Sequence, residues 1–300
     1  MDTKTSQAHS SLQRPEGDPP VRPIPEHRVD HALAPVYSDL KSTFGVPWVG
    51  VIAQAVAYYR PFFLEAWRQL QPSATTHYFE SCSNAIRLTS WECARDRFTI
   101  EPSAKALREL GYSDAELAAI RQTVDIFDYG NPKYLLLATA IQQSLCHGRR
   151  LGGGSPRNPR DTMPRAPIRQ CEPIPVMVEE HHAIGGLQDL YDDMKAVLRL
   201  PFINSDYKAL GRWPSCLELL WRGLRTEVDS EAYVQVRRAV HEEALATVAE
   251  LPYAYKVDEQ RALDLDMPNA EVQQVISLFQ WLLSGLIVNV SWYKRALAVD

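Results

Sequence analysis

Apolar residues recur at intervals of three and four along most of this chain, which is the spacing of one face of an α-helix. Some of these stretches open with a capping pattern, as the Ser113–Glu116 pair does, and some end at a glycine. The pattern predicts helices over residues 36–45, 113–130, 231–251 and 269–297. Alternating apolar and polar runs bounded by hairpin turns are absent from the sequence, so we expect an all-α fold.

One stretch is apolar enough to raise the question of a membrane. Residues 272–292 carry no charged side chain, and that length can span a bilayer. Polar residues nevertheless recur at intervals of three, four or seven, on one stripe of the helix: Gln273, Ser277, Gln280, Ser284 and Ser291. No second candidate span occurs in the sequence. We therefore expect a buried helix and no membrane partner.

Composition and charge exclude several classes of protein. The net charge of −5 gives no basic surface for nucleic acid, and an anionic substrate would need local attraction against this overall charge. The five cysteines are scattered without a Cys-x-x-Cys pair, so neither a disulfide framework nor a zinc knuckle is indicated. The His and Glu clusters at 179–182 and 241–245 lack the spacing of a zinc site, so no metal is expected. The expected location is a reducing cytoplasm.

Two proline-rich segments divide the chain. Residues 1–30 combine proline with polar residues and have no apolar core, which predicts a disordered N-terminal arm and not a signal peptide. Residues 148–180 contain a run rich in proline and glycine that cannot sustain a helix, so they predict a linker. Two helical regions remain, at 31–147 and 181–300.

The two helical regions resemble one another. Residues 37–68 align with residues 191–222 at a constant offset of 154, without a gap. The identical pairs include Tyr37/Tyr191, Asp39/Asp193, Lys41/Lys195, Pro47/Pro201, Ala55/Ala209, Trp67/Trp221 and Arg68/Arg222. The alignment indicates an internal duplication. We therefore expect two tandem helical repeats packed as a pseudo-dimer about a two-fold axis.

Asp206 breaks the similarity between the two copies. In the segment FINSDYKAL (202–210), Asn204 or Ser205 has the position of a helix N-cap. Asp206 can then be an ordinary acid in the first helical turn. The repeat favours a second interpretation, because Ile52 occupies the equivalent position. An aliphatic position is expected to point inward, and a buried carboxylate tends to have a raised pKa, so Asp206 is a candidate catalytic group.

Three segments carry a resemblance to a known family. VPWVGVIAQAVAYYRPFFLEAWR (46–68), FDYGNPKYLLLATA (127–140) and SDYKALGRWP (205–214) are similar to the 2-haloacid dehalogenases that accept both D and L enantiomers. The resemblance covers roughly residues 33–293 and implies an all-helical tandem repeat that works without a cofactor. It also implies that water directly attacks the halogen-bearing carbon of a 2-haloalkanoic acid. Halide leaves, configuration inverts and no covalent intermediate forms. The family further suggests a homodimer.

The resemblance also implies roles for individual residues. Asp206 matches the base that activates the water, and Asn131 matches an asparagine that holds this water with it. Thr76 and Glu80 are implied to hydrogen-bond substrate or water, or to orient the base. The other residues implied to lie at the substrate are Trp48, Tyr134 and Ser205. The ordinary alternatives stay open: a core aromatic for Trp48, a solvated helix face for Thr76 and Glu80, and a helix cap for Ser205. We expect the substrate carboxylate to bind backbone N–H groups at a helix N-terminus.

Two positions depart from the family, and two rival functions remain. Phe279 stands where a tyrosine is expected near the substrate, and Val51 stands where a phenylalanine is expected. Both changes affect how a substrate is held. One rival is a noncatalytic helical binding protein for a small organic acid. The other is a hydrolase that uses the same water-activating pair on a different leaving group. A halide-release assay distinguishes them from the dehalogenase.

Overall fold

The structure, a computed structural model, describes residues 12–154, 158–164, 174–257, 259–264 and 268–298. Within these residues regular structure is helical, with two isolated β-bridges and no strand, as the sequence predicts. The α-helices are α1 (Ala34–Phe44), α2 (Val51–Val56), α3 (Arg60–Ala74), α4 (His77–Arg97), α5 (Ala104–Glu109), α6 (Asp114–Leu145), α7 (Gly186–Leu198), α8 (Ser205–Leu210), α9 (Pro214–Arg225), α10 (Glu231–Ala249), α11 (Glu259–Asp264) and α12 (Asn269–Ala296).

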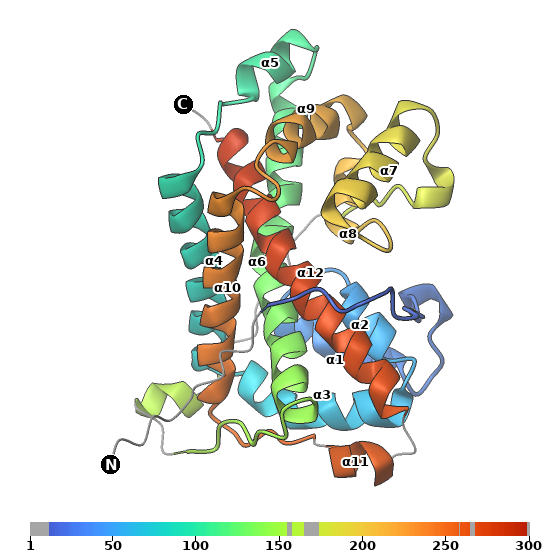
Figure 1. Cartoon of the computed structure of the whole chain (residues 1–300), viewed down its shortest axis with the longest axis vertical. Helices are drawn as coiled ribbons and strands as arrows, with labels where there is room; N and C mark the ends of the chain where they lie inside the picture. Colours follow the sequence, from blue (N-terminus) through green and yellow to red (C-terminus); the bar gives the residue numbers. More distant parts are fainter. Residues whose placement is uncertain (1–11, 155–157, 165–173, 258, 265–267, 299–300) are drawn as a thin grey trace.

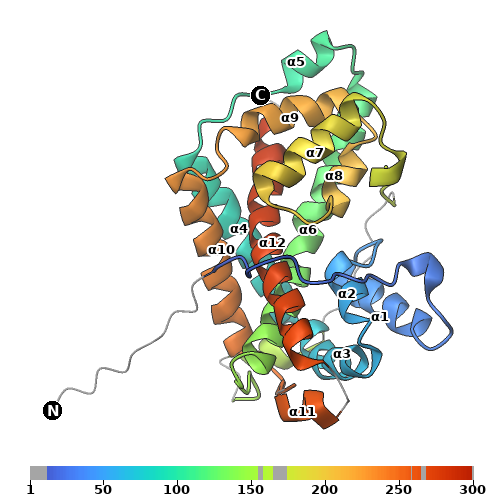
Figure 2. The same cartoon turned by 45° about the vertical axis from the view of Figure 1, so that its right-hand side comes forward.

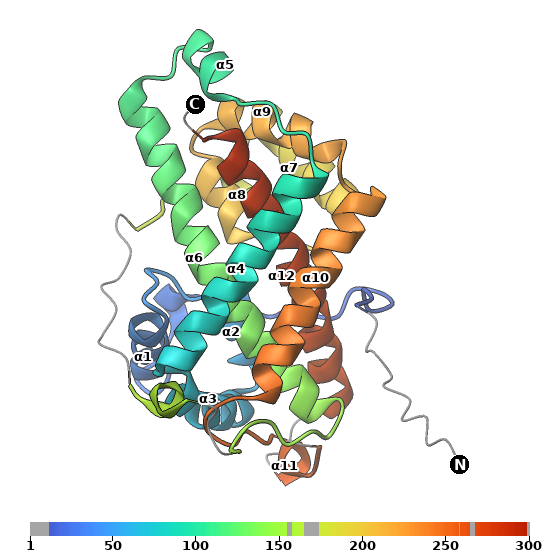
Figure 3. The same cartoon turned by 90° about the vertical axis from the view of Figure 1, so that its left-hand side faces the viewer.

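Four long helices form the body of the molecule. α6 and α12 pack along each other, and α4 and α10 lie beside them on one side (Figures 1 and 3). Two groups of shorter helices lie on the other side of this body, α1 to α3 in one group and α7 to α9 in the other (Figure 2). Each long central helix therefore has contacts with short helices from both groups, and this arrangement places α2 and α8 near one another.

The apolar stretch predicted as a buried helix is α12. An 18-residue window of this helix is apolar enough to cross a membrane, and 89% of that window is buried inside the protein. Its polar stripe bonds to neighbouring groups in the interior. The Ser291 hydroxyl donates to the Ser90 hydroxyl at 2.8 Å, and the Ser284 hydroxyl donates to the Gln280 carbonyl at 2.9 Å. α12 is therefore a core helix, and these two serine hydroxyls are hydrogen-bonded in the interior.

The offset of 154 found in the sequence also relates hydrogen bonds. In the first copy Glu26 accepts from the Val49 N–H at 2.9 Å, and in the second Glu180 accepts from the Ile203 N–H at 2.7 Å. Further bonds related by the same offset are Lys41–Glu26 and Lys195–Glu180, Trp67–Asp39 and Trp221–Asp193, and Tyr37–Ile24 and Tyr191–Val178. These matched bonds support the duplication, which stays a prediction about the origin and division of the chain.

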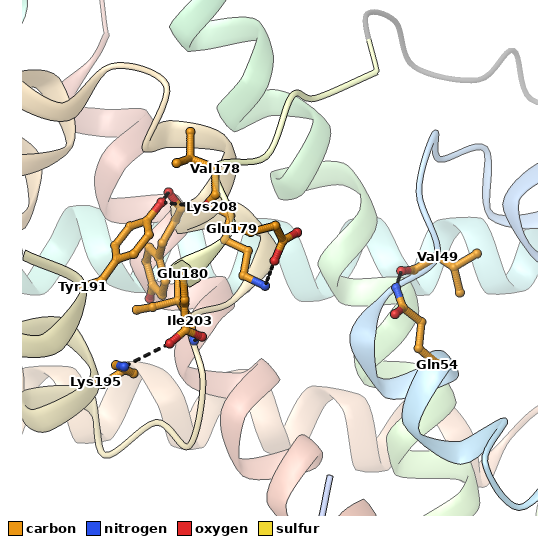
Figure 4. Close-up of polar contacts among 10 residues, drawn as sticks. Val49, Gln54, Val178, Glu179, Glu180, Tyr191, Lys195, Ile203 and Lys208 are labelled. Atoms are coloured by element: carbon orange, nitrogen blue, oxygen red, sulfur yellow. Dashed lines mark hydrogen bonds and ion pairs between the residues drawn. The ribbon is translucent and has the colours of Figure 1, made fainter. Parts of the chain in front are cut away.

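The two copies differ where their side chains differ. Gln54 donates to the Val49 carbonyl at 2.7 Å, whereas Lys208 at the equivalent position pairs with Glu179 at 2.8 Å (Figure 4). Side chains at equivalent positions of the two copies can therefore make different polar contacts. In the same way Asp206 in the second copy occupies the position of Ile52 in the first.

The predicted end of a helix at Gly130 is wrong. α6 continues through Gly130 and Pro132 to Leu145, although proline lacks the N–H that an inner helical turn needs. The residues beyond Pro132 are almost all buried. Burial of these apolar turns against α12 outweighs the local preference of glycine and proline to end a helix.

Residues 12–30, the described part of the predicted N-terminal arm, are hydrogen-bonded to the rest of the protein. This segment lies along the body in an extended form, held by backbone and side-chain bonds. The Ile24 N–H donates to the Gln54 carbonyl at 3.0 Å, and the Tyr37 hydroxyl donates to the Ile24 carbonyl at 2.8 Å. Residues 1–11, and within the predicted linker residues 155–157 and 165–173, lie outside the described residues.

Candidate active site

Asp206 lies in the first turn of α8 and points into the protein. Its side chain is 3% exposed, comparable with the equivalent Ile52 at 1%. Its Oδ2 accepts a hydrogen bond of 2.7 Å from Nδ2 of Asn131 on α6. No side-chain bond caps α8 at Asn204. The structure therefore favours the inward interpretation of Asp206 over a solvent-facing acid beside a capping residue.

The surroundings of Asp206 change its acidity. Burial raises the pKa of this carboxyl to about 7, because removal from water disfavours the charged form. The hydrogen bond from Asn131 acts in the opposite direction and stabilises the carboxylate. A general base works best when its pKa lies near the operating pH. Asp206 is therefore suited to accept a proton at neutral pH.

A cavity of about 20 Å³ adjoins these two side chains, which is enough for about one water molecule. Residues of both halves of the chain line it: Trp48, Gly50, Val51, Ile52, Asn131, Tyr134, Asn204, Ser205, Asp206, Phe279, Leu283 and Leu286. The lining includes the predicted Trp48, Tyr134, Ser205 and Phe279. Apolar side chains make up most of the walls, and the polar side chains among the lining residues are Asn131, Asn204, Ser205 and Asp206. Such a chamber can hold a water against Asp206.

Tyr134 is hydrogen-bonded to the backbone of Trp48, and the Trp48 indole packs against Gly130. The Tyr134 hydroxyl donates to the Trp48 carbonyl at 2.7 Å, so it holds the loop before α2 and is not directed at a substrate. The Trp48 ring packs on Phe127 with centroids 4.7 Å apart. A Cβ added at Gly130 would lie 2.4 Å from this indole, so glycine is required where α6 passes Trp48. The pocket wall therefore depends on Gly130, whose position the sequence had suggested was a helix end.

Thr76 and Glu80 are not among the residues that line this cavity, and their roles toward substrate, water or base stay predictions. The Thr76 hydroxyl caps α4 by accepting from the Phe79 N–H, and it donates to the Ser73 carbonyl at 2.6 Å. Glu80 pairs with the fully buried Lys133 at 2.8 Å. Since Lys133 is two residues from Asn131 on α6, this ion pair supports the site from behind and does not contact the cavity.

Asn204 is a lining residue that the sequence had suggested only as a cap. Its side chain is 6% exposed, and its buried Oδ1 has no hydrogen-bond partner. The signal was present in the repeat, where Gly50 occupies the equivalent position. Leu283 and Leu286 of α12 were also missed, because nothing in an apolar helix distinguishes a cavity wall from the rest of the core.

The chemistry of the site is that of a buried carboxylate with an amide partner. Among the described residues no group of three or more His, Cys, Asp or Glu side chains is placed to hold a metal ion. The described cysteines, Cys82, Cys93, Cys146 and Cys216, are free thiols. The residues at the cavity can therefore activate one water and shield it from solvent.

Comparisons with known proteins identify relatives of this arrangement. Residues 47–182 match the family model described as Halocarboxylic acid dehydrogenase DehI. An (R)-2-haloacid dehalogenase of Pseudomonas putida is 53% identical over 298 residues, which cover 98% of this chain and 99% of that protein. A configuration-inverting 2-haloacid dehalogenase of Alcaligenes xylosoxydans xylosoxydans is 26% identical and covers 87% of this chain and 88% of its own.

A solved structure of the same kind superposes on nearly the whole chain. It is the complex of a D-2-haloacid dehalogenase mutant with D-2-CPA, 53% identical to this chain. The match has a TM-score of 0.93 and covers 96% of this chain and 99% of that one. The fold around the buried carboxylate is thus shared with proteins that are named as 2-haloacid dehalogenases.

Proposed function

This chain belongs to the DehI family of 2-haloacid dehalogenases, and from that membership we propose how its own residues carry out the reaction. The reaction is the hydrolytic removal of halide from a 2-haloalkanoic acid with inversion of configuration. The contact that supports the proposal is the 2.7 Å bond between Asn131 and the buried Asp206.

Asp206 is the general base in this proposal. Its carboxylate takes a proton from a water in the cavity while the water oxygen bonds to C2 of the substrate. The carbon–halogen bond breaks on the opposite side, and its electron pair leaves with the halide. The product is a 2-hydroxy acid of inverted configuration. General-base assistance of this kind contributes typically about 10²–10⁴-fold to a rate.

Asn131 orients the water and the base together. Its amide nitrogen donates to Asp206, which leaves the amide oxygen to accept the second hydrogen of the water. The indole of Trp48 and the ring of Phe279 exclude other water from the reacting carbon. Because the dielectric constant is low where water is excluded, the Asp206 carboxylate attracts the proton of the attacking water more strongly than it would in bulk solvent. The Ser205 hydroxyl and the first N–H groups of α2 and α8 are the proposed partners of the substrate carboxylate.

Isotope labelling tests the direct attack. With enzyme in excess over 2-chloropropionate in water labelled with oxygen-18, we expect the lactate of the first turnover to carry the label. Direct attack takes the new oxygen from water, whereas an ester to Asp206 would give the first product an oxygen of the protein. Mass spectrometry of the lactate and of the peptide containing residue 206 distinguishes these paths. Unlabelled lactate in the first turnover would overturn the mechanism.

The enantiomer range is a separate proposal. The relative that is 53% identical is named for the (R) enantiomer, whereas the resemblance in the sequence predicts that both are accepted. We propose that this chain converts (R)-2-chloropropionate to (S)-lactate about tenfold or more faster than it converts the (S) substrate, a ratio typical of small steric differences in a pocket. Halide release from each pure enantiomer, with chiral chromatography of the lactate, measures this ratio. Equal rates for the two enantiomers would contradict this proposal and would support the acceptance of both that the sequence resemblance predicts.

A further inference from the structure

A second, larger cavity adjoins the candidate active site. Its volume is about 410 Å³, and Asn204 and Leu286 line both cavities, so these two side chains form the partition between them. Residues 13–16 of the N-terminal segment close one side, where the segment crosses α12 (Figure 2). The smaller chamber holds only about one water, so a 2-haloacid has to arrive from a neighbouring space.

Arg237 of α10 lines the larger cavity and has an unusual environment. Its guanidinium lies 3.9 Å from the centroid of the Trp281 ring, and its Nη2 donates to the Trp281 carbonyl at 2.6 Å. Its Nε is buried without a hydrogen-bond partner. A Cβ added at Gly285 would lie 3.6 Å from this guanidinium, which is ordinary van der Waals contact, so Arg237 packs directly against α12.

No carboxylate of the described residues forms an ion pair with Arg237. The other two arginines of the cavity are already paired, Arg14 with Asp18 and Arg199 with Asp229, the latter at 3.4 Å. A buried cation without a bonded anion is costly, and burial lowers the pKa of Arg237 to about 10. The cavity is therefore lined by a positive group that no carboxylate of the described residues pairs with, which suits a small anion.

Polar groups continue from Arg237 toward α8. The Tyr233 hydroxyl donates to Asn289 Oδ1 at 2.8 Å, and Asn289 Nδ2 donates to the Tyr207 hydroxyl at 2.7 Å. Tyr207 follows Asp206 in the chain. Asn204, which has the unpartnered Oδ1, stands between this polar wall and the smaller chamber. The cavity that Arg237 lines is thus separated from the smaller chamber by the side chains of Asn204 and Leu286.

We propose that the larger cavity is an anion-binding vestibule, in which Arg237 holds a small monovalent anion between solvent and Asp206. This inference rests on the proposed function for the identity of the anions, which are the 2-halocarboxylate on its way in and the halide on its way out. The net charge of −5 makes a local cation necessary for both. The leucines that line the cavity, Leu198, Leu200, Leu282 and Leu286, accommodate the alkyl part of the carboxylate.

Crystallography of the whole protein tests binding without turnover. Crystals are soaked in bromide or in lactate, and bromide is located by its anomalous scattering. We expect bromide, lactate or both within hydrogen-bond distance of Arg237, and neither in crystals of Arg237→Gln. Bromide alone would identify the vestibule as a halide exit, and lactate alone as a carboxylate site. If both anions were absent from Arg237 in the wild-type protein, the inference would be wrong even if halide release were normal.

Kinetics with a matched pair of variants tests the role of the site. Arg237→Gln removes the cavity cation, and Arg238→Gln removes the neighbouring exposed cation on the same helix. We expect Arg237→Gln to raise KM for 2-chloropropionate about ten- to a hundredfold, the range for losing a charged hydrogen bond, with kcat within about twofold. Arg237→Lys restores part of the loss, and Arg238→Gln leaves KM unchanged.

Two results would contradict the vestibule. An equal change in KM for the two glutamine variants would show only a loss of general surface charge. A fall in kcat at constant KM in folded Arg237→Gln would place the residue in the chemical step. Absence of halide release from the wild-type protein, with bromide or lactate bound at Arg237, would instead refute the proposed function and leave the anion site standing.

Discussion

Asp206→Asn is expected to abolish most halide release and, at the same time, to make the protein more stable above neutral pH. The amide cannot take a proton from the water, so kcat should fall by about 10²–10⁴-fold. The hydrogen bond from Asn131 is retained, because the amide oxygen of the new side chain accepts it. The loss of activity therefore reports the base and not a collapse of the pocket.

The gain in stability follows from the direction of the pKa shift. Burial raises the pKa of Asp206 from 3.8 to about 7, so the ionised form is less favourable in the folded protein than in the unfolded chain. The stability of the wild-type protein consequently decreases as the pH rises from about 4 to about 7. An amide never ionises, so the free energy of unfolding of Asp206→Asn should exceed that of wild type by up to about 4 kcal/mol at about pH 8. Near pH 4 the two should be close.

Chemical denaturation at these two pH values checks the prediction, and Asp193→Asn is its control. Asp193 accepts from Trp221 at 2.7 Å and from Arg225 at 2.9 Å, and the hydrogen bond from Arg225 lowers its pKa. Its replacement should reduce stability at neutral pH and leave kcat unchanged. If Asp206→Asn were less stable than wild type at pH 8, the carboxyl would not have the buried environment described above. Full activity in Asp206→Asn would assign the base elsewhere.

Asn131→Asp is expected to move the pH dependence of the enzyme upward. In the wild-type protein, kcat/KM should rise through a midpoint at about pH 7 as Asp206 loses its proton. The side-chain atoms of residues 131 and 206 are 2.7 Å apart, and two carboxyls at that distance cannot both ionise easily. The pair would share a proton at neutral pH, so activity near pH 7 should fall about tenfold or more and recover partly at higher pH.

Two further variants separate charge from geometry. Asn131→Leu removes the hydrogen bond and the acceptor for the water, so its activity should stay low at every pH. Gln143→Glu places the same new charge on α6 beside Arg149, whose Nη1 donates to Gln143 at 2.9 Å, and should keep the wild-type midpoint. A midpoint that does not move in Asn131→Asp would show that residue 131 does not act on the base.

The inward direction of Asp206 was predictable because residues 191–222 can be aligned with residues 37–68 of the same chain. The offset of 154 places Asp206 against Ile52 and Asn204 against Gly50, and both polar side chains are buried. An aliphatic residue in one copy reports the direction of the side chain in the other. Asn131 has no such counterpart within the aligned segments, and its role came from the resemblance of one motif.

The predicted helix end was wrong because long-range packing opposed a local signal. Gly130 and Pro132 are strong local indicators of a helix end, but α6 continues because its second half is buried against α12. For Thr76 and Glu80 the structure adds contacts within the protein: Thr76 caps α4 and Glu80 pairs with Lys133. The types of these residues indicated polar contacts, and the sequence did not identify the partners.

The sequence by itself determined the helical class, the internal alignment at an offset of 154 and the polarity of each position, because periodicity and alignment are read directly from the order of residues. Only the tertiary structure decided that α6 and α8 bring Asn131 to Asp206, and that Arg237 lies under the N-terminal segment next to Trp281. These contacts join residues far apart in the chain, and burial raises the pKa of Asp206. The pattern of residues along the chain does not give the distance between such side chains or their exposure to solvent.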